Sequence, residues 1–384
     1  MIYLDNAAST PLPQSVKNEL LSLLDEYGNP SSLHAKGQSA KRILCSARKS
    51  AADFLNCDPE NIYFTPGGAA ANTLGIRGYA ARHDCHIFYS PTAHKSVLNC
   101  VHTLPQSTPL KVSQTGRIVL SGLKEALKNS CRTPFVVIDY ANSEIGTIQN
   151  VQKILEIVHA CNGVVYLDCT GSIPTIPVDL KQLDADMLGF SAHKLGGLKG
   201  CGVFYKKPDI ELEPLIYGSQ ERGLIGGTEN IFGTASLNCA LKQHDYSLVS
   251  PANRDYVYRY ILHHIPESYL VGSFKNRLAH NLYICFKGVD GEALTLLLDA
   301  DGIAVSTGSA CNSQSLEPSA ILSAIGMDEN DMHSCIRMTF CGQEPKEELD
   351  YVCHRLKINV ERLRSFHATE LCSPFCDITK QEGG

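Results

Sequence analysis

The chain has 384 residues, of which 43% are apolar, and a formal net charge of −6 at pH 7. This length is long for one domain and suits two, and the apolar content is enough for a sizeable buried core. The scattered lysines and arginines exclude a basic stripe that would bind nucleic acid. No stretch reaches the roughly 20 apolar residues of a membrane span, and no signal peptide opens the chain. We therefore expect a cytoplasmic protein with no membrane partner.

The 16 cysteines are dispersed without regular spacing. In a chain of this size that usage indicates reduced thiols and not a disulfide framework. Cys372 and Cys376 could bind a metal, but no second pair or histidine cluster lies near them in the sequence. We therefore predict no metal site.

The first 250 residues alternate short β-rich runs with helical stretches, which predicts an α/β fold with a mainly parallel central sheet. The predicted strands are Asn61–Thr65, His86–Ser90, Phe135–Tyr140, Val164–Asp168, Met187–Phe190 and Gly202–Tyr205. The predicted helices are Ser39–Leu55, Ala69–Arg82, His94–Thr103, Leu120–Leu127 and Val151–Ala160.

After about Ser250 the pattern changes to a helix near Asn253–His263, shorter strands and a long amphipathic helix near Pro345–Arg364. This pattern predicts a smaller α+β domain. We expect a large domain at 13–249, a small domain at 1–12 and 250–376, and a C-terminal tail at 377–384. The first dozen residues would pass from the small domain into the large one.

Ligands of open parallel sheets bind beyond the carboxyl ends of the strands. A glycine turn with Gly68 and Ala69 follows the first predicted strand and opens a helix, where free amides favour a phosphate, although such a turn is more often only a turn. Asp168 ends another strand. It could simply cap the next segment, or it could bind a cation such as a protonated pyridine nitrogen.

Ser191, Ala192, His193 and Lys194 follow the next strand and precede a glycine-rich turn. A loop lysine is usually a solvated surface charge. Here the amine would be desolvated at the end of an apolar strand, as a lysine that binds an aldehyde requires, and the serine and histidine could reach a phosphate.

Three further residues could carry chemistry. His94, in the same region, is by default a surface or core histidine, but at the open end of the sheet it could stack on a ring and move protons. Cys311 lies in a run of small polar residues, Ser306–Ser313, where a thiol can act as a nucleophile. Arg337, in an apolar strand-like run, could form an interdomain salt bridge or clamp a substrate carboxylate.

Taken in order, these segments resemble the NifS/IscS-like cysteine desulfurases, which are class V of the fold-type I pyridoxal-phosphate enzymes. The resemblance runs from Tyr3 to about Arg364. It rests on the ordered set Tyr-Leu-Asp-Asn-Ala-Ala-Ser-Thr-Pro, Gly-Asn-Pro-Ser-Ser-Leu-His, Asn-Ser-Glu-Ile-Gly-Thr-Ile-Gln, Ser-Ala-His-Lys, Gln-Glu-Arg-Gly, Gly-Gly-Thr-Glu-Asn and Ser-Thr-Gly-Ser-Ala-Cys-Asn-Ser.

The resemblance implies a role for each position. Lys194 would bind pyridoxal 5'-phosphate covalently, with Asp168 on the ring nitrogen and His94 stacked on the ring. Cys311 would take sulfur from L-cysteine, leaving L-alanine and a persulfide for an acceptor protein in iron–sulfur cluster or thiolation pathways. The other implied contacts are with the phosphate (Gly68, Ala69, Ser191, His193, and Thr228 from the second subunit of a homodimer) and with the substrate (Arg337, Asn142 and Ser143).

Several positions depart from the family pattern, namely Ala69, Ala70, Ser143, Gly171 and Ile225. Each hydrogen bond lost there could cost on the order of 1 kcal/mol of cofactor binding. The sequence therefore leaves three alternatives: an active cysteine desulfurase, a related class V enzyme such as a selenocysteine lyase or aminotransferase, or a non-catalytic partner-binding protein. The sulfur acceptor is not indicated.

Overall fold

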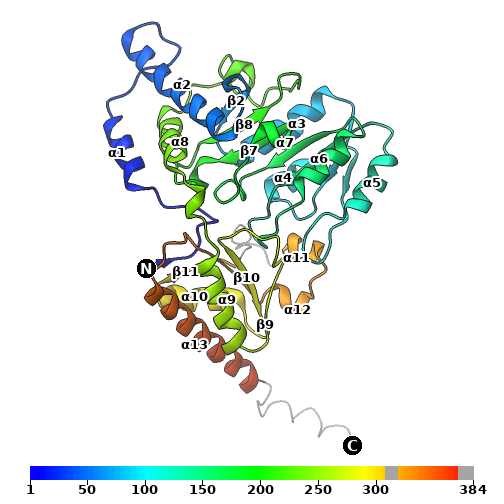
Figure 1. The fold of residues 1–384 in the computed structure, drawn as a ribbon, viewed down its shortest axis with the longest axis vertical. Helices are drawn as coiled ribbons and strands as arrows, with labels where there is room; N and C mark the ends of the chain where they lie inside the picture. The colour runs from blue at the N-terminus through cyan, green and yellow to red at the C-terminus, as the bar shows by residue number, and fades with distance from the viewer. Residues whose placement is uncertain (308–318, 371–384) are drawn as a thin grey trace, which may run out of the picture.

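The structure is a computed structural model that describes residues 1–307 and 319–370. A seven-stranded sheet lies in the upper part of the molecule in Figure 1. Its order is β2 (Ile62–Thr65), β8 (Gly202–Lys206), β7 (Met187–Ser191), β6 (Val164–Asp168), β5 (Thr133–Asp139), β3 (Cys85–Tyr89) and β4 (Ser107–Pro109). The strands from β7 to β4 pair in parallel, whereas β8 runs antiparallel to both neighbours. The prediction of an α/β fold with a mainly parallel sheet is confirmed.

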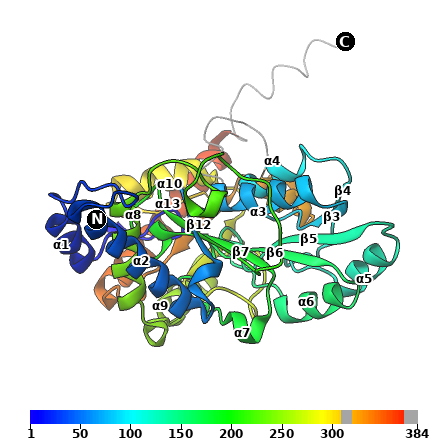
Figure 2. The ribbon, with the colours of Figure 1, turned by 90° about the horizontal axis from the view of Figure 1, so that it is seen from above.

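Both faces of this sheet are buried. Successive residues of a strand point to opposite faces, so each strand contributes side chains to two cores. In β5, Val136 and Ile138 pack into one core, and Phe135 and Val137 pack into the other. The first core is covered by α2 (Ala35–Leu55), α5 (Leu120–Lys128), α6 (Val151–His159), α7 (Leu180–Leu183) and α8 (Ile231–Gln243), and the second by α3 (Gly68–Arg82) and α4 (Lys95–Val101). Figure 2 shows α6 and α7 on one side of the sheet and α3 and α4 on the other.

The predicted helices and strands all have counterparts, with small shifts at their ends. Asn61, predicted as the start of a strand, instead closes the 3₁₀ turn Pro59–Asn61, because Asp58 caps that turn by accepting from the backbone N–H of Glu60. The prediction omitted β4, α8 and α1 (Gln14–Ser22), which packs against α8. The remaining short 3₁₀ helices are Ala192–Lys194 (η2), Glu221–Gly223 and Tyr246–Leu248.

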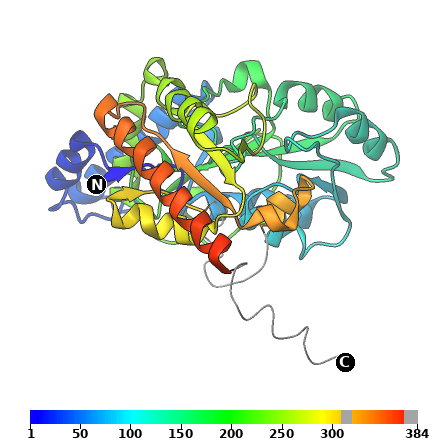
Figure 3. The same cartoon turned by 90° about the horizontal axis from the view of Figure 1, so that it is seen from below.

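A smaller antiparallel sheet forms the lower part of the molecule, in the order β12 (Cys335–Thr339), β10 (Asn281–Phe286) and β9 (Ser268–Leu270). One face packs on α9 (Ala252–His264), α10 (Gly291–Ala300) and α13 (Lys346–Glu370), and the other on α11 (Ala320–Ala324) and α12 (Glu329–Met332). Figure 3 shows α13 running beside α9 across the underside. The predicted domain boundaries at 12–13 and 249–250 stay a prediction.

The N-terminal segment joins the two parts of the molecule. Its strand β1 (Ile2–Tyr3) pairs in parallel with β11 (Ile303–Ala304), and Asp5 bridges to Thr339 at the end of β12. The chain then crosses to the large sheet, where the backbone N–H of Thr10 donates to the carbonyl of His193. In the described part of the chain, no helix combines the length and apolar character that crossing a membrane would require.

Candidate active site

A cavity of about 510 Å³ lies beyond the carboxyl ends of β5, β6 and β7. Asp168, Ser191 and Lys194 line it from these strand ends, His94 lines it from the start of α4, and Arg337 lines it from β12. The structure thus brings together an amine, a carboxylate, an imidazole and a guanidinium from four separate parts of the sequence. Convergence at this edge is what the sheet topology predicts.

Asp168 is buried and held by α3. The side-chain amide of Asn72 donates to its Oδ2 at 2.8 Å, and the backbone N–H of Thr170 donates to its Oδ1 at 2.9 Å. The hydroxyl of Tyr166 donates to Oδ1 of Asn72, which fixes which end of that amide faces the carboxylate. The Asp168 side chain is therefore oriented at the floor of the cavity, where it can bind a cationic ring nitrogen.

The N-terminus of α3 forms a cradle without side chains. A Cβ added at Gly68 would lie 2.8 Å from Oγ1 of Thr170 and 3.0 Å from Oγ of Ser191. The cap residue Gly67 has no side chain to cap the helix, and Oγ1 of Thr170 is buried without a hydrogen-bond partner in the described residues. The backbone N–H of Gly68 donates to Oγ of Ser191 at 2.7 Å. Amides and hydroxyls grouped in this way at a helix N-terminus fit a phosphate group. Ala69 can add only its backbone amide to this cradle.

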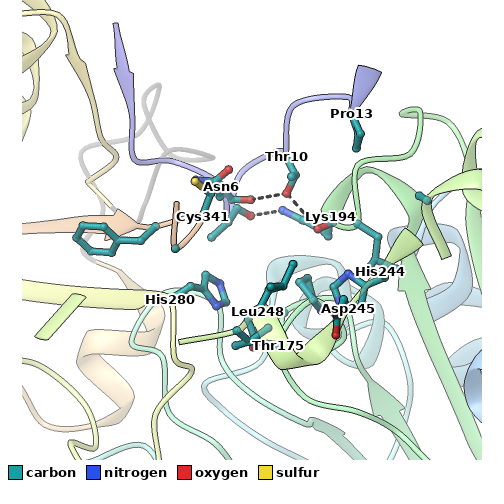
Figure 4. A pocket seen from close by; sticks show the side chains of 18 of the residues that line it. Asn6, Thr10, Pro13, Thr175, Lys194, His244, Asp245, Leu248, His280 and Cys341 are labelled. Carbon is teal, nitrogen blue, oxygen red and sulfur yellow. Dashed lines mark hydrogen bonds between the residues drawn. The ribbon is translucent and has the colours of Figure 1, made fainter. Parts of the chain in front are cut away.

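Lys194 ends η2 and reaches back to the N-terminal segment. Its Nζ donates to the carbonyl oxygens of Ala7 and Ala8, the latter at 2.9 Å. Figure 4 shows Lys194 beside Thr10, whose hydroxyl donates to the Lys194 carbonyl at 3.0 Å. The amine thus lies in the wall of the cavity with two backbone acceptors, within the same site as Asp168.

The two histidines of the site are both favoured in their neutral form. Burial, together with the positive charges of Lys194 and Lys199, lowers the pKa of His193 to about 4. Burial also lowers the pKa of His94, while the charge of Asp168 opposes that shift. The His94 side chain is open to the cavity although protein surrounds it, so water reaches the ring when no ligand is present.

The tautomer of His94 follows from its cap. The backbone N–H of Ser96 donates to Nδ1 of His94 at 3.1 Å, so Nδ1 carries the lone pair and the proton resides on Nε2. Capping α4 therefore holds the imidazole in one orientation with a single N–H directed away from the helix. A neutral ring of this kind can stack on an aromatic ligand and exchange a proton at Nε2.

Arg337 forms an ion pair with Asp5, which the predicted boundaries assign to the same small domain, and a hydrogen bond to Ser143 of the large one. Its Nη2 donates to Oδ1 of Asp5 at 2.9 Å and its Nη1 to the carbonyl of Ser143 at 3.2 Å. Nε is buried and has no partner in the described residues. Because Arg337 also lines the cavity, one donor edge of the guanidinium remains available to a carboxylate.

The side-chain amide of Asn142 is already occupied by the backbone. It donates to the carbonyl of Thr92 at 2.6 Å and accepts from the N–H groups of Glu144 and Ile145. Asn142 and Ser143 both line the cavity, but Asn142 mainly shapes the turn that follows β5.

The remaining predicted residues lie elsewhere. Thr228 is exposed and outside this cavity. Cys311, Cys372 and Cys376 lie outside the described residues. Within residues 1–307 and 319–370, no three His, Cys, Asp or Glu side chains are grouped in a way that could hold a metal ion.

A second cavity, of about 350 Å³, adjoins the first on the other side of Lys194. Figure 4 shows His244, His280 and Thr175 from the seam between the two sheets around this space. Burial, together with the positive charge of Arg337, lowers the pKa of His280 to about 4. Lys194 and Gly171 line both cavities, so the amine can be reached from either one.

Comparison with known proteins agrees with this geometry. The family model described as aminotransferase class-V matches residues 2–352. The cysteine desulfurase IscS of Methanosarcina thermophila is 36% identical over 380 residues, which cover 95% of this chain and 93% of the relative. A solved NifS-like protein superposes with a TM-score of 0.85 at 29% identity, covering 95% of this chain and 99% of the other. The structure of SspA in complex with cysteine superposes with a TM-score of 0.79 at 28% identity, covering 90% of this chain and all of the other.

The chain therefore belongs to the aminotransferase class-V family, among its cysteine desulfurases. The predicted fold type and family resemblance are confirmed. The comparisons do not favour the alternatives of another class V enzyme or a non-catalytic protein.

Sequence reasoning missed three residues of the site. Asn72, Thr170 and Asp139 all line the cavity. Asn72 stands one turn into α3, and Asp139 ends β5 as Asp168 ends the neighbouring strand. The rule that polar residues at parallel strand ends face one site could have found Asp139. No local signal marks Asn72 or Thr170, since their roles depend on how α3 packs over the sheet.

Proposed function

We propose that the protein is a cysteine desulfurase that uses pyridoxal 5'-phosphate to convert L-cysteine into L-alanine and a persulfide on Cys311. The observation that carries this proposal is the convergence of Lys194, Asp168 and His94 on one cavity that also contains Arg337. The family, and a structural relative solved with cysteine, support the reaction and its substrate.

The cofactor site is proposed from the cradle and the strand ends. Lys194 would bind the aldehyde carbon, Asp168 would accept a hydrogen bond from the N–H of the ring nitrogen, and His94 would stack on the ring. Gly68 and Ala69 offer backbone amides to the phosphate, and Ser191, His193 and Thr170 offer side chains. When bound, pyridoxal phosphate supplies an electron sink for the bonds of the substrate's amino-bearing carbon.

The chain's own residues bind and orient the substrate. Arg337 donates from its Nε–H to the substrate carboxylate, and Ser143 lies beside it in the wall of the cavity. The Lys194 amine, held between backbone carbonyls, exchanges protons with the substrate at the carbon next to the carboxylate. The neutral His94 moves a proton through Nε2.

Sulfur leaves by attack of the Cys311 thiolate on the substrate sulfur. The new bond joins the two sulfur atoms, the carbon–sulfur bond of the substrate breaks, and the substrate carbon gains a proton to give alanine. One cysteine and one thiol thus become one alanine and one persulfide, with no external oxidant. An acceptor protein then takes the persulfide sulfur.

A homodimer completes the proposed site, with Thr228 of each subunit reaching the phosphate of the other. In the single chain Thr228 is exposed, and the nearby Tyr217 and Ile216 are also exposed, at 78% and 48%. Apolar surface beside a solvent-facing threonine is consistent with a covered interface.

The deciding experiment supplies the purified protein with pyridoxal phosphate, L-cysteine and a reductant. We expect alanine and sulfide in equal amounts, and Cys311→Ala should release no sulfide while it still binds the cofactor. Sulfide release by Cys311→Ala at the unaltered rate would exclude the persulfide route. A protein that takes up no cofactor would contradict the whole proposal.

A further inference from the structure

Asp139 is a second carboxyl group beside Asp168. The two residues are register partners at the carboxyl ends of the parallel strands β5 and β6, so their side chains lie on the same face of the sheet. Both line the cavity of the proposed site. The structure therefore places two acidic side chains together at the floor of this cavity, whereas the proposed function assigns a role only to Asp168.

The environments of the two carboxyl groups differ sharply. Asp168 accepts hydrogen bonds from Asn72 and Thr170 on its two oxygens. Asp139 is 4% exposed, and neither of its oxygens makes a hydrogen bond in the described part of the chain. A buried carboxylate without hydrogen bonds is strongly disfavoured relative to its protonated form.

The groups around Asp139 add to this asymmetry. The acidic and basic side chains that line the same cavity are Asp168, Glu144, His94, His193, Lys95, Lys194, Lys199 and Arg337. Burial, with the negative charge of Asp168, raises the pKa of the Asp139 carboxyl to about 7.

Two polar neighbours oppose the shift without cancelling it. Ser90 and Asn142 lie close enough to lower the pKa of Asp139, but neither forms a hydrogen bond of good geometry with it. The hydroxyl of Ser90 pairs with that of Thr92, and the Asn142 amide donates to the Thr92 carbonyl.

We infer that Asp139 and Asp168 share one negative charge, with Asp139 the protonated member. Asp139 is then a positioning residue, because its protonation state sets how much negative charge lies beside a ring nitrogen bound at Asp168. The inference rests on the proposed role of Asp168 toward the ring nitrogen. When Asp139 loses its proton, a second negative charge lies beside Asp168. Two adjacent negative charges hold a proton on a neighbouring ring nitrogen more tightly than one does.

The first test needs no cofactor. Infrared difference spectra of the apo protein, recorded between about pH 5 and about pH 9, should contain the carbonyl band of a protonated carboxylic acid that disappears near neutral pH. Asp139→Asn, which keeps the shape without the proton, should lack this band. Persistence of the band in Asp139→Asn would overturn the assignment.

Two further measurements separate charge from structure. In Asp168→Asn the Asp139 band should titrate at lower pH, because the neighbouring charge is gone, and an unmoved titration would contradict the shared charge. As the pH rises from about 5 to about 8, the melting temperature of Asp139→Asn should increase relative to that of the wild type. Only the wild type has a buried acid whose ionisation is disfavoured in the folded state. A constant offset would indicate a purely structural residue.

The cofactor-loaded protein supplies the last readout. The absorbance of bound pyridoxal phosphate should show a transition near neutral pH in the wild type that is missing in Asp139→Asn, while Asp139→Leu tests whether shape alone matters. Identical titrations in wild type and Asp139→Asn would refute the action through Asp168. Failure to bind any cofactor, with the apo results intact, would instead count against the proposed function.

Discussion

The side-chain amide of Asn72 donates to Oδ2 of Asp168 at 2.8 Å and so ties the first turns of α3 to the end of β6. The same amide donates to Oγ of Ser96, next to His94. One asparagine thus links the proposed phosphate cradle, the carboxylate and the start of α4. Its position sets the distance between the groups that would hold the two ends of the cofactor.

Asn72→Ala should therefore weaken cofactor binding without removing any group that touches the cofactor directly. Loss of a hydrogen bond to a charged carboxylate costs about 1.5 to 3 kcal/mol, which corresponds to about 10- to 150-fold weaker binding. Titration of the apo protein with pyridoxal phosphate measures this. Asn129→Ala, at the end of α5, is the matched control and should bind normally. Equal affinity in both variants would show that Asn72 does not organise the site.

Lys194→Ala should abolish covalent attachment of the cofactor. After borohydride reduction, mass spectrometry of the wild type should find the cofactor fixed at residue 194 and nowhere else. Lys124→Ala, on the exposed side of α5, should behave as the wild type does. Covalent labelling at another lysine would contradict the assignment.

Arg337→Ala should raise KM for L-cysteine by about 10- to 100-fold, because a charge-assisted pair with the carboxylate is lost. Arg337 also pairs with Asp5, so Asp5→Asn separates the two roles. That variant removes the ion pair and keeps the guanidinium, and we expect its KM to stay within about threefold of the wild type. A large rise in KM for Asp5→Asn as well would assign the effect to the ion pair.

Acid should destabilise the folded chain in part through His280. Burial lowers the pKa of this histidine to about 4, whereas an unfolded histidine titrates near about 6.5. Between these two pH values the unfolded state therefore binds more protons than the folded state. The free energy of unfolding should fall by roughly 3 kcal/mol as the pH is lowered from about 6.5 to about 4. Denaturant unfolding at several pH values should show a shallower loss for His280→Gln. An unchanged slope would contradict the neutral buried histidine.

A buried ion pair far from the chemistry should matter for folding. Arg48 makes two hydrogen bonds to Glu221, which also accepts from the backbone N–H of Phe64 at 2.9 Å. Glu221→Ala leaves Arg48 without its partner and should cost about 3 kcal/mol of unfolding free energy. Glu60→Ala, which breaks the exposed pair with Arg222, should cost less than about 1 kcal/mol. Comparable losses would show that burial does not govern these pairs.

Much of this architecture could be predicted from residue patterns because the strands are apolar and end in polar residues. Asp168 and Ser191 were found because each directly follows a buried run. Periodicity could not reveal that β8 runs antiparallel, since a strand buried on both faces carries no mark of direction. The short β4 was missed because Ser107–Pro109 lacks the apolar residues of a strand and only borders β3.

The details of the site depend on contacts between distant residues. The sequence could not predict that the Asn142 amide is taken up by Thr92, or that Asp5 occupies part of the Arg337 guanidinium. It also gave no reason to expect a second cavity behind Lys194, which is formed jointly by residues near 175, 244 and 280. These features follow from how the two sheets are placed against each other.

The pairing of β1 with β11, and of Asp5 with Arg337, has a consequence for synthesis on the ribosome. Ile2, Tyr3 and Asp5 meet their partners only after more than 300 further residues have been translated. Strands β2 to β8 can assemble earlier, since they pair among themselves. The N-terminal segment that carries the backbone acceptors for Lys194 therefore stays unpaired until then, and the wall of the active-site cavity is completed late in folding.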